Sequence, residues 1–270
     1  TLDEKAKLER DSALTATRLE NAEKLTRLLA DEYVRWKENV KKMDQQILNL
    51  IGDVFVSAGA ISYLGPFTGN YRETCVAAWS DICKNLKIPC SDSVSLIDVM
   101  CNPITIKEWQ LNGLPTDSVS TNNAVMFTRC ERWPLCIDPQ QQAKKWINNT
   151  YEKSNLQVTR LTDKNLLRTL EVAIRLGQPL LLEDIGETLD PALEPVLLKA
   201  VFKQSGRTLI HIGDSDIDYN PEFKFMMTTK LPNPHYLPEV CIKVTLINFT
   251  VTFEGLEDQL LGRVVSHEAP

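Results

Sequence analysis

The sequence predicts an α/β protein with a mostly parallel sheet flanked by helices, preceded by one long helix of the coiled-coil type. From residue 132 onward, short aliphatic runs alternate with helical patterns, which is typical of parallel strands covered on both faces. Residues 1–51 contain neither glycine nor proline and carry an apolar heptad pattern. Of 270 residues, 43% are apolar and 24% charged, which suits a sizeable core.

The N-terminal helix is predicted from apolar residues that recur at alternating steps of three and four. If residues 1–51 were all helical, they would extend about 77 Å at roughly 1.5 Å per residue. Two interpretations remain, one strand of a coiled coil or an amphipathic helix packed along its own domain. The predicted seam, in which Thr15 and Thr26 are weak positions, consists of Leu19, Ala22, Leu29, Tyr33, Trp36, Val40, Met43, Ile47 and Leu50.

A set of shorter helices is expected to follow, because Gly52 and Asp53 predict the end of the long helix. The helical patterns cover 54–64, 71–86, 93–100 and 105–111, and a helical turn covers 120–124. Residues 54–71 carry no charge, but their three glycines and one proline favour a buried helix and turn over a membrane span.

The sheet is predicted from strands that alternate with helices in the second half of the chain. Residues 214–221 are interpreted as an acidic turn. The expected helices cover 144–155, 165–175, 191–202 and 256–265, and the expected strands cover 133–137, 157–160, 178–183, 208–212, 223–229 and 244–253.

The stretch 132–146 has the order strand, tight turn and helix, in which phosphate-binding P-loops occur. When the pattern G-x-x-x-x-G-K-[ST] is laid on residues 138–145, only Lys144 is retained. Asp138 and Ala143 replace the two glycines whose backbone would cradle phosphate, and Lys145 replaces the hydroxyl that would hold Mg²⁺. We therefore predict a P-loop frame without its chemistry, in which Asp138 repels phosphate and the loop is filled by its own side chains. Lys144 could still face an anion or could be only a solvated charge.

Two further positions resemble parts of a nucleotide site. The aliphatic run 180–182 leads into Glu183 and Asp184, where a Walker B strand would present Asp before Glu. This pair could hold a cation, or it could only cap the next turn or bond a neighbouring loop. A polar sensor would fall on Lys230 or Thr229, and lysine departs from the usual asparagine.

Composition excludes or disfavours several other functions. The net charge of −6 gives no electrostatic case for nucleic acid binding. The seven cysteines and three histidines show no zinc-ligand spacing. An odd number of scattered cysteines favours a reducing compartment. The run Asp214, Asp216 and Asp218 begins like a calcium loop, but Tyr219 stands where that loop needs glycine.

Several strings together resemble the dynein heavy chain, over essentially the whole chain. One further string, N-P-H-Y-L-P at 233–238, resembles the axonemal branch of that family. The strings that carry the main resemblance are S-Y-L-G-P-F at 62–67, G-L-P-T-D at 113–117, I-D-P-Q-Q-Q-A at 137–143, L-D-P-A-L-E-P at 189–195 and G-L-E-D-Q-L-L at 255–261.

The resemblance implies a role for each part. Residues 1–51 would form the base of the returning stalk helix, whose outgoing partner lies elsewhere in the heavy chain. Residues 52–255 would form the large subdomain of the fifth AAA+ module, and 256–270 would begin the small subdomain or buttress. Partners would be neighbouring modules, the outgoing stalk helix and, through the stalk tip, microtubules. The location would be the cytoplasm and cytoskeleton, in the axoneme of a cilium or flagellum.

Three functions remain open from the sequence. The first is a non-catalytic ring module of a microtubule motor, with no cofactor of its own and with ATP and Mg²⁺ bound by other modules. The second is a regulatory nucleotide binder or weakly active ATPase. The third is a coiled-coil adaptor for which the α/β part is only an anchor. A nucleotide titration would separate the first from the second.

Overall fold

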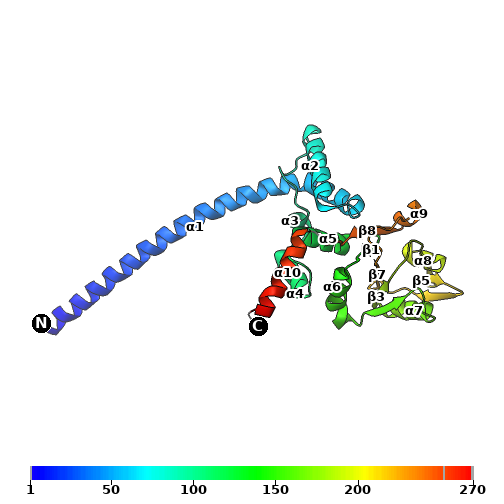
Figure 1. Cartoon of the computed structure of the whole chain (residues 1–270). Coiled ribbons are helices and arrows are strands. Elements are labelled where there is room, and N and C mark those ends of the chain that lie inside the picture. The colour runs from blue at the N-terminus through cyan, green and yellow to red at the C-terminus, as the bar shows by residue number, and fades with distance from the viewer. Residues whose placement is uncertain (1, 252, 269–270) are drawn as a thin grey trace.

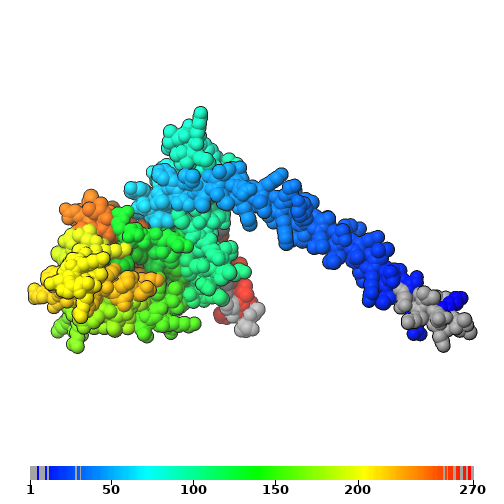
Figure 2. All heavy atoms as spheres, turned by 180° about the vertical axis from the view of Figure 1, so that it is seen from behind, coloured from blue at the N-terminus to red at the C-terminus, as the bar shows by residue number. Residues whose placement is uncertain are grey.

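A computed structural model describes residues 2–251 and 253–268 of the chain. Its dominant feature is helix α1 (Leu2–Tyr63), which projects as a single rod from a body formed by the rest of the chain (Figures 1 and 2). Sixty-two residues correspond to about 93 Å at the usual rise per residue. The free part of the rod is the charged heptad segment, and the other end packs into the body.

The predicted end of this helix at Gly52 is wrong, because α1 continues through it to Tyr63. Gly52 instead lies where the loop after α2 crosses the helix. A Cβ atom on Gly52 would lie 2.4 Å from the Pro89 carbonyl oxygen, and the Gly52 amide donates to that oxygen at 3.1 Å. Asp53 accepts hydrogen bonds from the Ser91 amide (2.8 Å) and hydroxyl (2.6 Å). Glycine here permits a close approach of backbone rather than a break.

Four helices connect α1 to the sheet, as the sequence predicted in outline. Side-chain caps at Ser95, Asn102 and Asp117 begin the last three of them. The last helix is longer than the single turn predicted at 120–124, because its buried face continues through Phe127. The four are α2 (Gly69–Asn85), α3 (Leu96–Met100), α4 (Pro103–Leu111) and α5 (Ser118–Arg129).

A five-stranded sheet with the order β2-β3-β7-β1-β8 forms the centre of the body, and all its neighbouring strands are parallel. This confirms the predicted α/β fold with a mostly parallel sheet flanked by helices. The strands are β1 (Trp133–Ile137), β2 (Gln157–Arg160), β3 (Pro179–Glu183), β7 (Lys224–Thr229) and β8 (Val244–Asn248).

Both faces of the sheet are buried, because successive side chains along each strand enter different cores. Leu180 and Leu182 belong to a core that α7 (Leu166–Leu176) covers. Leu181 belongs to the other core, which α5, α6 (Gln142–Tyr151) and the end of α1 cover. The 3-10 turn η1 (Glu152–Ser154) follows α6.

A second, antiparallel sheet corrects two predictions. The expected helix over 191–202 is only η2 (Pro191–Leu193) and α8 (Glu194–Leu197), and the expected turn at 214–221 contains a strand. The positive φ angles of Ser205 and Gly206 match a two-residue hairpin turn, which favours strands over helix on both sides. The sheet consists of β4 (Val201–Gln204), β5 (Arg207–Ile212) and β6 (Ser215–Asp218).

The chain ends in α9 (Pro238–Cys241) and α10 (Phe253–Glu268), so the strand expected over 244–253 stops at Asn248. One helix, the described segment Ser12–Tyr63 of α1, includes an 18-residue window with mean hydropathy of 1.2, which is apolar enough for a membrane span. Val56, Ala60 and Ile61 at its C-terminal end are buried against the body. Packing within the protein accounts for their apolar character.

Candidate functional site

The candidate site lies at the carboxyl edge of the main sheet, where β1, β3 and β7 end side by side. Asp138 follows β1, Glu183 ends β3 and Lys230 follows β7. Ligands of open α/β sheets bind at this edge. The fold therefore brings together the residues that the sequence singled out from three separate motifs.

Asp138 fills the place where a P-loop would hold phosphate. Its carboxylate is 1% exposed and accepts hydrogen bonds from the amides of Gln142 (2.8 Å to Oδ1) and Lys144 (2.9 Å to Oδ2). These amides belong to the first turn of α6, and the N-terminal amides of a helix are the usual anion-binding groups. An internal carboxylate therefore occupies the anion cradle of the frame.

The backbone around Asp138 is adapted to this arrangement. Gln141 has a φ angle of 60°, and its amide donates to the Asp138 carbonyl at 3.2 Å, which closes a tight turn before α6. Ala143 is fully buried under the same turn. Burial raises the pKa of the Asp138 carboxyl, and hydrogen bonds from the surrounding backbone amides oppose that rise.

Lys144 contacts a carboxylate of the neighbouring strand. Its ammonium nitrogen lies 2.9 Å from Oε1 of Glu183, which is buried, and Arg160 lies 3.6 Å from the other oxygen of that carboxylate. The interpretation of Lys144 as a merely solvated charge is therefore wrong. In a working site the lysine would face phosphate, whereas here Glu183 takes that place.

Asp184 completes the cluster with the residue at the sensor position. Lys230 lies 2.9 Å from one oxygen of Asp184, and Arg160 Nε lies 3.4 Å from the other. Asp184 has a φ angle of 55°, so the chain turns sharply after β3. Thr229, the alternative sensor position, donates to the Ile185 carbonyl at 2.6 Å. Both candidates for the sensor are thus occupied by contacts within the protein.

Lys145 is exposed and lies outside this cluster. Its side chain runs toward the loop at Gly113, where its Cε lies 4.0 Å from the position of a Cβ on that glycine. An ammonium group has no lone pair with which to bind a cation. The residue at the magnesium position therefore neither faces the cradle nor offers a ligand for the metal.

Sequence reasoning missed Arg160, which links Glu183 and Asp184 from the end of β2. The signal was present, because β2 is the parallel neighbour of β3 and Arg160 pairs with Glu183 in the ladder. A cation at the end of one strand and two anions at the end of the next are placed together at one edge.

The acidic run at 214–218 forms part of a hairpin rather than a loop around an ion. The Asp216 carboxylate accepts a hydrogen bond from His211 Nδ1 at 2.7 Å across the β5–β6 pair, and Ile217 between the acids is buried. Within the described residues, no group of three or more His, Cys, Asp or Glu side chains is arranged to hold a metal ion.

The apolar seam of α1 is the second candidate site, and it is an exposed surface. All large members of the seam are between 48% and 65% exposed, including Trp36 at 65%. Thr26 donates its hydroxyl to the Ala22 carbonyl at 2.8 Å, so this weak position turns its polar group to its own helix. The interpretation as a helix packed along its own domain is wrong for this segment, because its large apolar residues are exposed rather than buried.

Comparison with known proteins matches both parts of the chain. Residues 107–270 match the family described as the ATP-binding dynein motor region, and residues 1–81 match the microtubule-binding stalk of dynein motor. The chain is 54% identical over 269 residues (100% of the chain) to Dynein axonemal heavy chain 6 of Homo sapiens. It is 48% identical over 266 residues (98%) to Dynein axonemal heavy chain 1 of Mus musculus.

A third relative, Dynein axonemal heavy chain 3 of Mus musculus, is 47% identical over 253 residues, or 94% of the chain. In each case the chain spans about 6% of the length of the relative that it matches. The two family matches follow the two structural parts, the projecting helix and the sheet domain. The chain therefore belongs to the dynein heavy chain family, in which it joins a stalk segment to an AAA+ domain of the motor region.

Proposed function

We propose that this chain is the fifth AAA+ module of a dynein motor ring and that it couples the ring mechanically to the microtubule-binding stalk without catalysis of its own. The observation that carries the proposal is the continuity of α1. The helix that bears the exposed seam enters the core beneath the sheet, where Ala60, Ile61 and Leu64 are buried.

The filled phosphate cradle supports the non-catalytic part of the proposal. Polyphosphate would have to displace the Asp138 carboxylate from two helix amides and Glu183 from Lys144. Each unmade or repelling contact costs on the order of 1–3 kcal/mol. Together these costs would weaken a micromolar nucleotide site by several powers of ten, at about 1.4 kcal/mol per tenfold.

The proposal assigns roles to the parts of the chain. Residues 1–51 are the base of the returning stalk helix, 52–255 the degenerate large subdomain and 256–270 the start of the next helical segment. The partners are the outgoing stalk helix on the seam, the neighbouring AAA+ modules and, through the stalk tip, microtubules. The names of the relatives support a place in the axoneme of a cilium or flagellum.

A regulatory nucleotide binder or weakly active ATPase is the second candidate, and the description of the matching family as ATP-binding favours it. The retained Lys144 and the pair Glu183 and Asp184 would be its functional groups. The third, a coiled-coil adaptor with a passive anchor, is less well supported, because α1 shares its core with the sheet.

Calorimetry of the 270-residue chain with millimolar Mg-ATP separates the first two functions. We expect no saturable heat from the natural chain. Lys145→Ala should give the same result as the natural chain, because this exposed lysine lies outside the charged cluster. A dissociation constant below about 100 μM, equivalent to about −5.5 kcal/mol, would overturn the first function in favour of the second.

A further inference from the structure

Helix α2 contains a buried arginine that no carboxylate neutralises among the residues that the structure describes. Arg72 is 6% exposed, and burial lowers its pKa to about 10, so that it remains positively charged at neutral pH. Buried charges are normally paired, because an unpaired charge in a low-dielectric interior is costly. The position of Arg72 therefore calls for a specific set of acceptors.

Three neutral acceptors receive the guanidinium group. Nε donates to the Phe67 carbonyl at 2.9 Å, Nη2 to the Gly65 carbonyl at 2.7 Å and Nη1 to Oδ1 of Asn123 at 2.6 Å. Two of these acceptors belong to the loop that directly follows α1, and the third belongs to α5. Only a planar fork of donors can bond all three acceptors at once.

The same loop is joined to strand β8, which closes a ring of hydrogen bonds. The Asn248 amide donates to the Gly65 carbonyl at 2.9 Å, and the Asn123 side-chain amide donates to the Asn248 carbonyl at 2.8 Å. A Cβ on Gly65 would lie 2.0 Å from the Leu246 carbonyl oxygen, so the loop lies flat on the strand. β8 is an edge strand, and this loop supplies a backbone acceptor at the end of its otherwise open edge.

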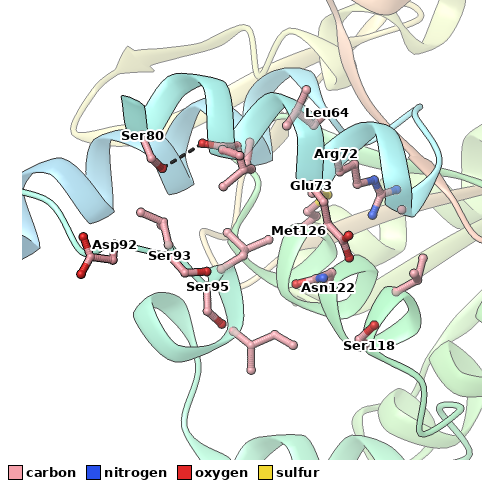
Figure 3. A pocket seen from close by; sticks show the side chains of 18 residues that line it. Leu64, Arg72, Glu73, Ser80, Asp92, Ser93, Ser95, Ser118, Asn122 and Met126 are labelled. Atoms are coloured by element: carbon pink, nitrogen blue, oxygen red, sulfur yellow. Dashed lines mark hydrogen bonds between the residues drawn. The ribbon is translucent and has the colours of Figure 1, made fainter. Parts of the chain in front are cut away.

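Packing next to the ring is incomplete, which increases the importance of the polar contacts. A groove of about 490 Å³ lies between α2 on one side and α3 and α5 on the other. Figure 3 shows Arg72 and Leu64 at one end of this groove and Ser80 and Asp92 at the other. Arg72, Ser80 and Cys83 are the buried residues of α2, so Arg72 is the principal tie at its N-terminal end.

We propose that Arg72 is the positioning residue that locks the base of α1 to β8, so that displacement of the stalk helix reaches the sheet as one rigid movement. β8 pairs with β1 along five residues. Strand β1, which precedes Asp138, should therefore move together with β8. The inference rests on the proposed coupling function and names the contact that transmits it.

Hydrogen exchange resolved to single amides in the whole 270-residue chain tests the lock. In Arg72→Gln, we expect the Asn248 amide to exchange at least tenfold faster, because its acceptor Gly65 is released. The Phe249 amide, which donates to Ile137 inside the sheet at 2.9 Å, should keep its protection. Arg72→Lys, which can reach only some of the acceptors, should give an intermediate rate.

Two further variants keep the test decisive. Ile174→Val removes one methylene from the core on the other face of the main sheet. It should not selectively raise the exchange rate of either the Asn248 or the Phe249 amide. If Arg72→Gln does not fold, Asn123→Ala opens the same ring from α5 and should give the same selective change at Asn248. An unchanged Asn248 rate in the folded variants, or equal acceleration of Asn248 and Phe249, would overturn the positioning role.

Failure of the proposed coupling function can be distinguished from failure of the Arg72 lock by a second experiment. When the variant is placed in the intact motor, release of the lock should weaken the dependence of microtubule affinity on the nucleotide state of the ring. If Asn248 is selectively released in the chain and this dependence is unchanged in the motor, the lock stands and the coupling function fails.

Discussion

A single aspartate determines the chemistry of the candidate site. The sequence showed that Asp138 replaces the first glycine of a P-loop, and from this it predicted repulsion of phosphate. It could not show that the carboxylate turns back onto the amides of Gln142 and Lys144. That geometry depends on the φ angle of 60° at Gln141, which no sequence pattern specifies.

Removal of this carboxylate should create an anion site. In Asp138→Ala, two partly buried amides lose their acceptor, and we expect a loss of about 1–3 kcal/mol in the free energy of unfolding. Because sulfate can take the place of the carboxylate, it should raise the melting temperature of this variant more than that of the natural chain.

The natural chain serves as the control for general stabilisation of proteins by sulfate. Asp214→Ala, which removes an exposed carboxylate, should respond like the natural chain. Equal responses of the natural chain and Asp138→Ala would contradict the view that the amides form an anion cradle.

The pH dependence of stability should reveal the same carboxyl group. Its pKa is raised in the folded chain by burial, above the ordinary value of 3.8. Between these two values the folded chain binds more protons than the unfolded chain, so this group's contribution to stability decreases as pH rises. We expect the difference in unfolding free energy between the natural chain and Asp138→Asn to fall from pH 4 upward.

Urea unfolding at a series of pH values measures this difference, in which the titration of all other carboxyl groups cancels. The difference should become constant once the pH exceeds the folded pKa. A difference that rises with pH would mean that the amide hydrogen bonds outweigh burial and that the pKa is lowered instead.

At the scale of elements, the strands and helices of the main sheet were predictable and the transitions between helix and loop were less so. Gly177 ends α7 with a φ angle of 70°, as its place after the apolar pattern indicated. Gly52 gave the same signal and was misleading, because the need for glycine comes from Pro89, which is distant in the sequence. Local patterns cannot distinguish a helix stop from a close tertiary contact.

The contact at Gly52 gives a prediction at this scale. Alanine is favoured over glycine inside a helix by about 1 kcal/mol, so Gly52→Ala should be stabilising if only α1 mattered. The new methyl would overlap the Pro89 carbonyl and Cys90, and we expect a net loss of about 1–3 kcal/mol with release of the loop that carries Ser91.

Thermal unfolding and exchange at the Ser91 amide measure both effects. Gly186→Ala is the control, because a Cβ at that glycine meets no atom within 4 Å. A stabilised Gly52→Ala variant with a protected Ser91 amide would show that the loop does not clamp the helix.

At the scale of the whole molecule, α1 is held by the contacts of Gly52 and Asp53, by burial of Ala60 and Ile61 in the core, and by the loop at Gly65 that follows it. The large apolar residues of the seam from Leu19 to Leu50 are exposed, and the seam was readable from sequence because a heptad pattern is local. The antiparallel hairpin sheet was not predicted, since its strands Val201–Gln204 and Ser215–Asp218 are short and mostly exposed. Such strands lack the apolar periodicity on which sequence prediction depends.

The unpartnered seam gives the last prediction. Leu29, Trp36 and Val40 are 57–65% exposed on one face of α1, and contiguous apolar surface of this kind promotes association. We expect the 270-residue chain to form dimers through residues 15–50 as its concentration rises, measured by sedimentation equilibrium. Val40→Glu with Met43→Glu should abolish dimers, whereas Lys41→Glu on the polar face should not.

Hydrogen exchange supplies the complementary observation under conditions in which the chain is monomeric. Without a partner for the seam, an isolated helix is marginal in water, and residues 1–30 should exchange rapidly while the body stays protected. Residues 54–67 should share the protection of the body, because Ala60 and Leu64 are part of its core. Strong protection of residues 1–30 in a proven monomer would contradict the stalk assignment, because the rod would then be stable without a coiled-coil partner.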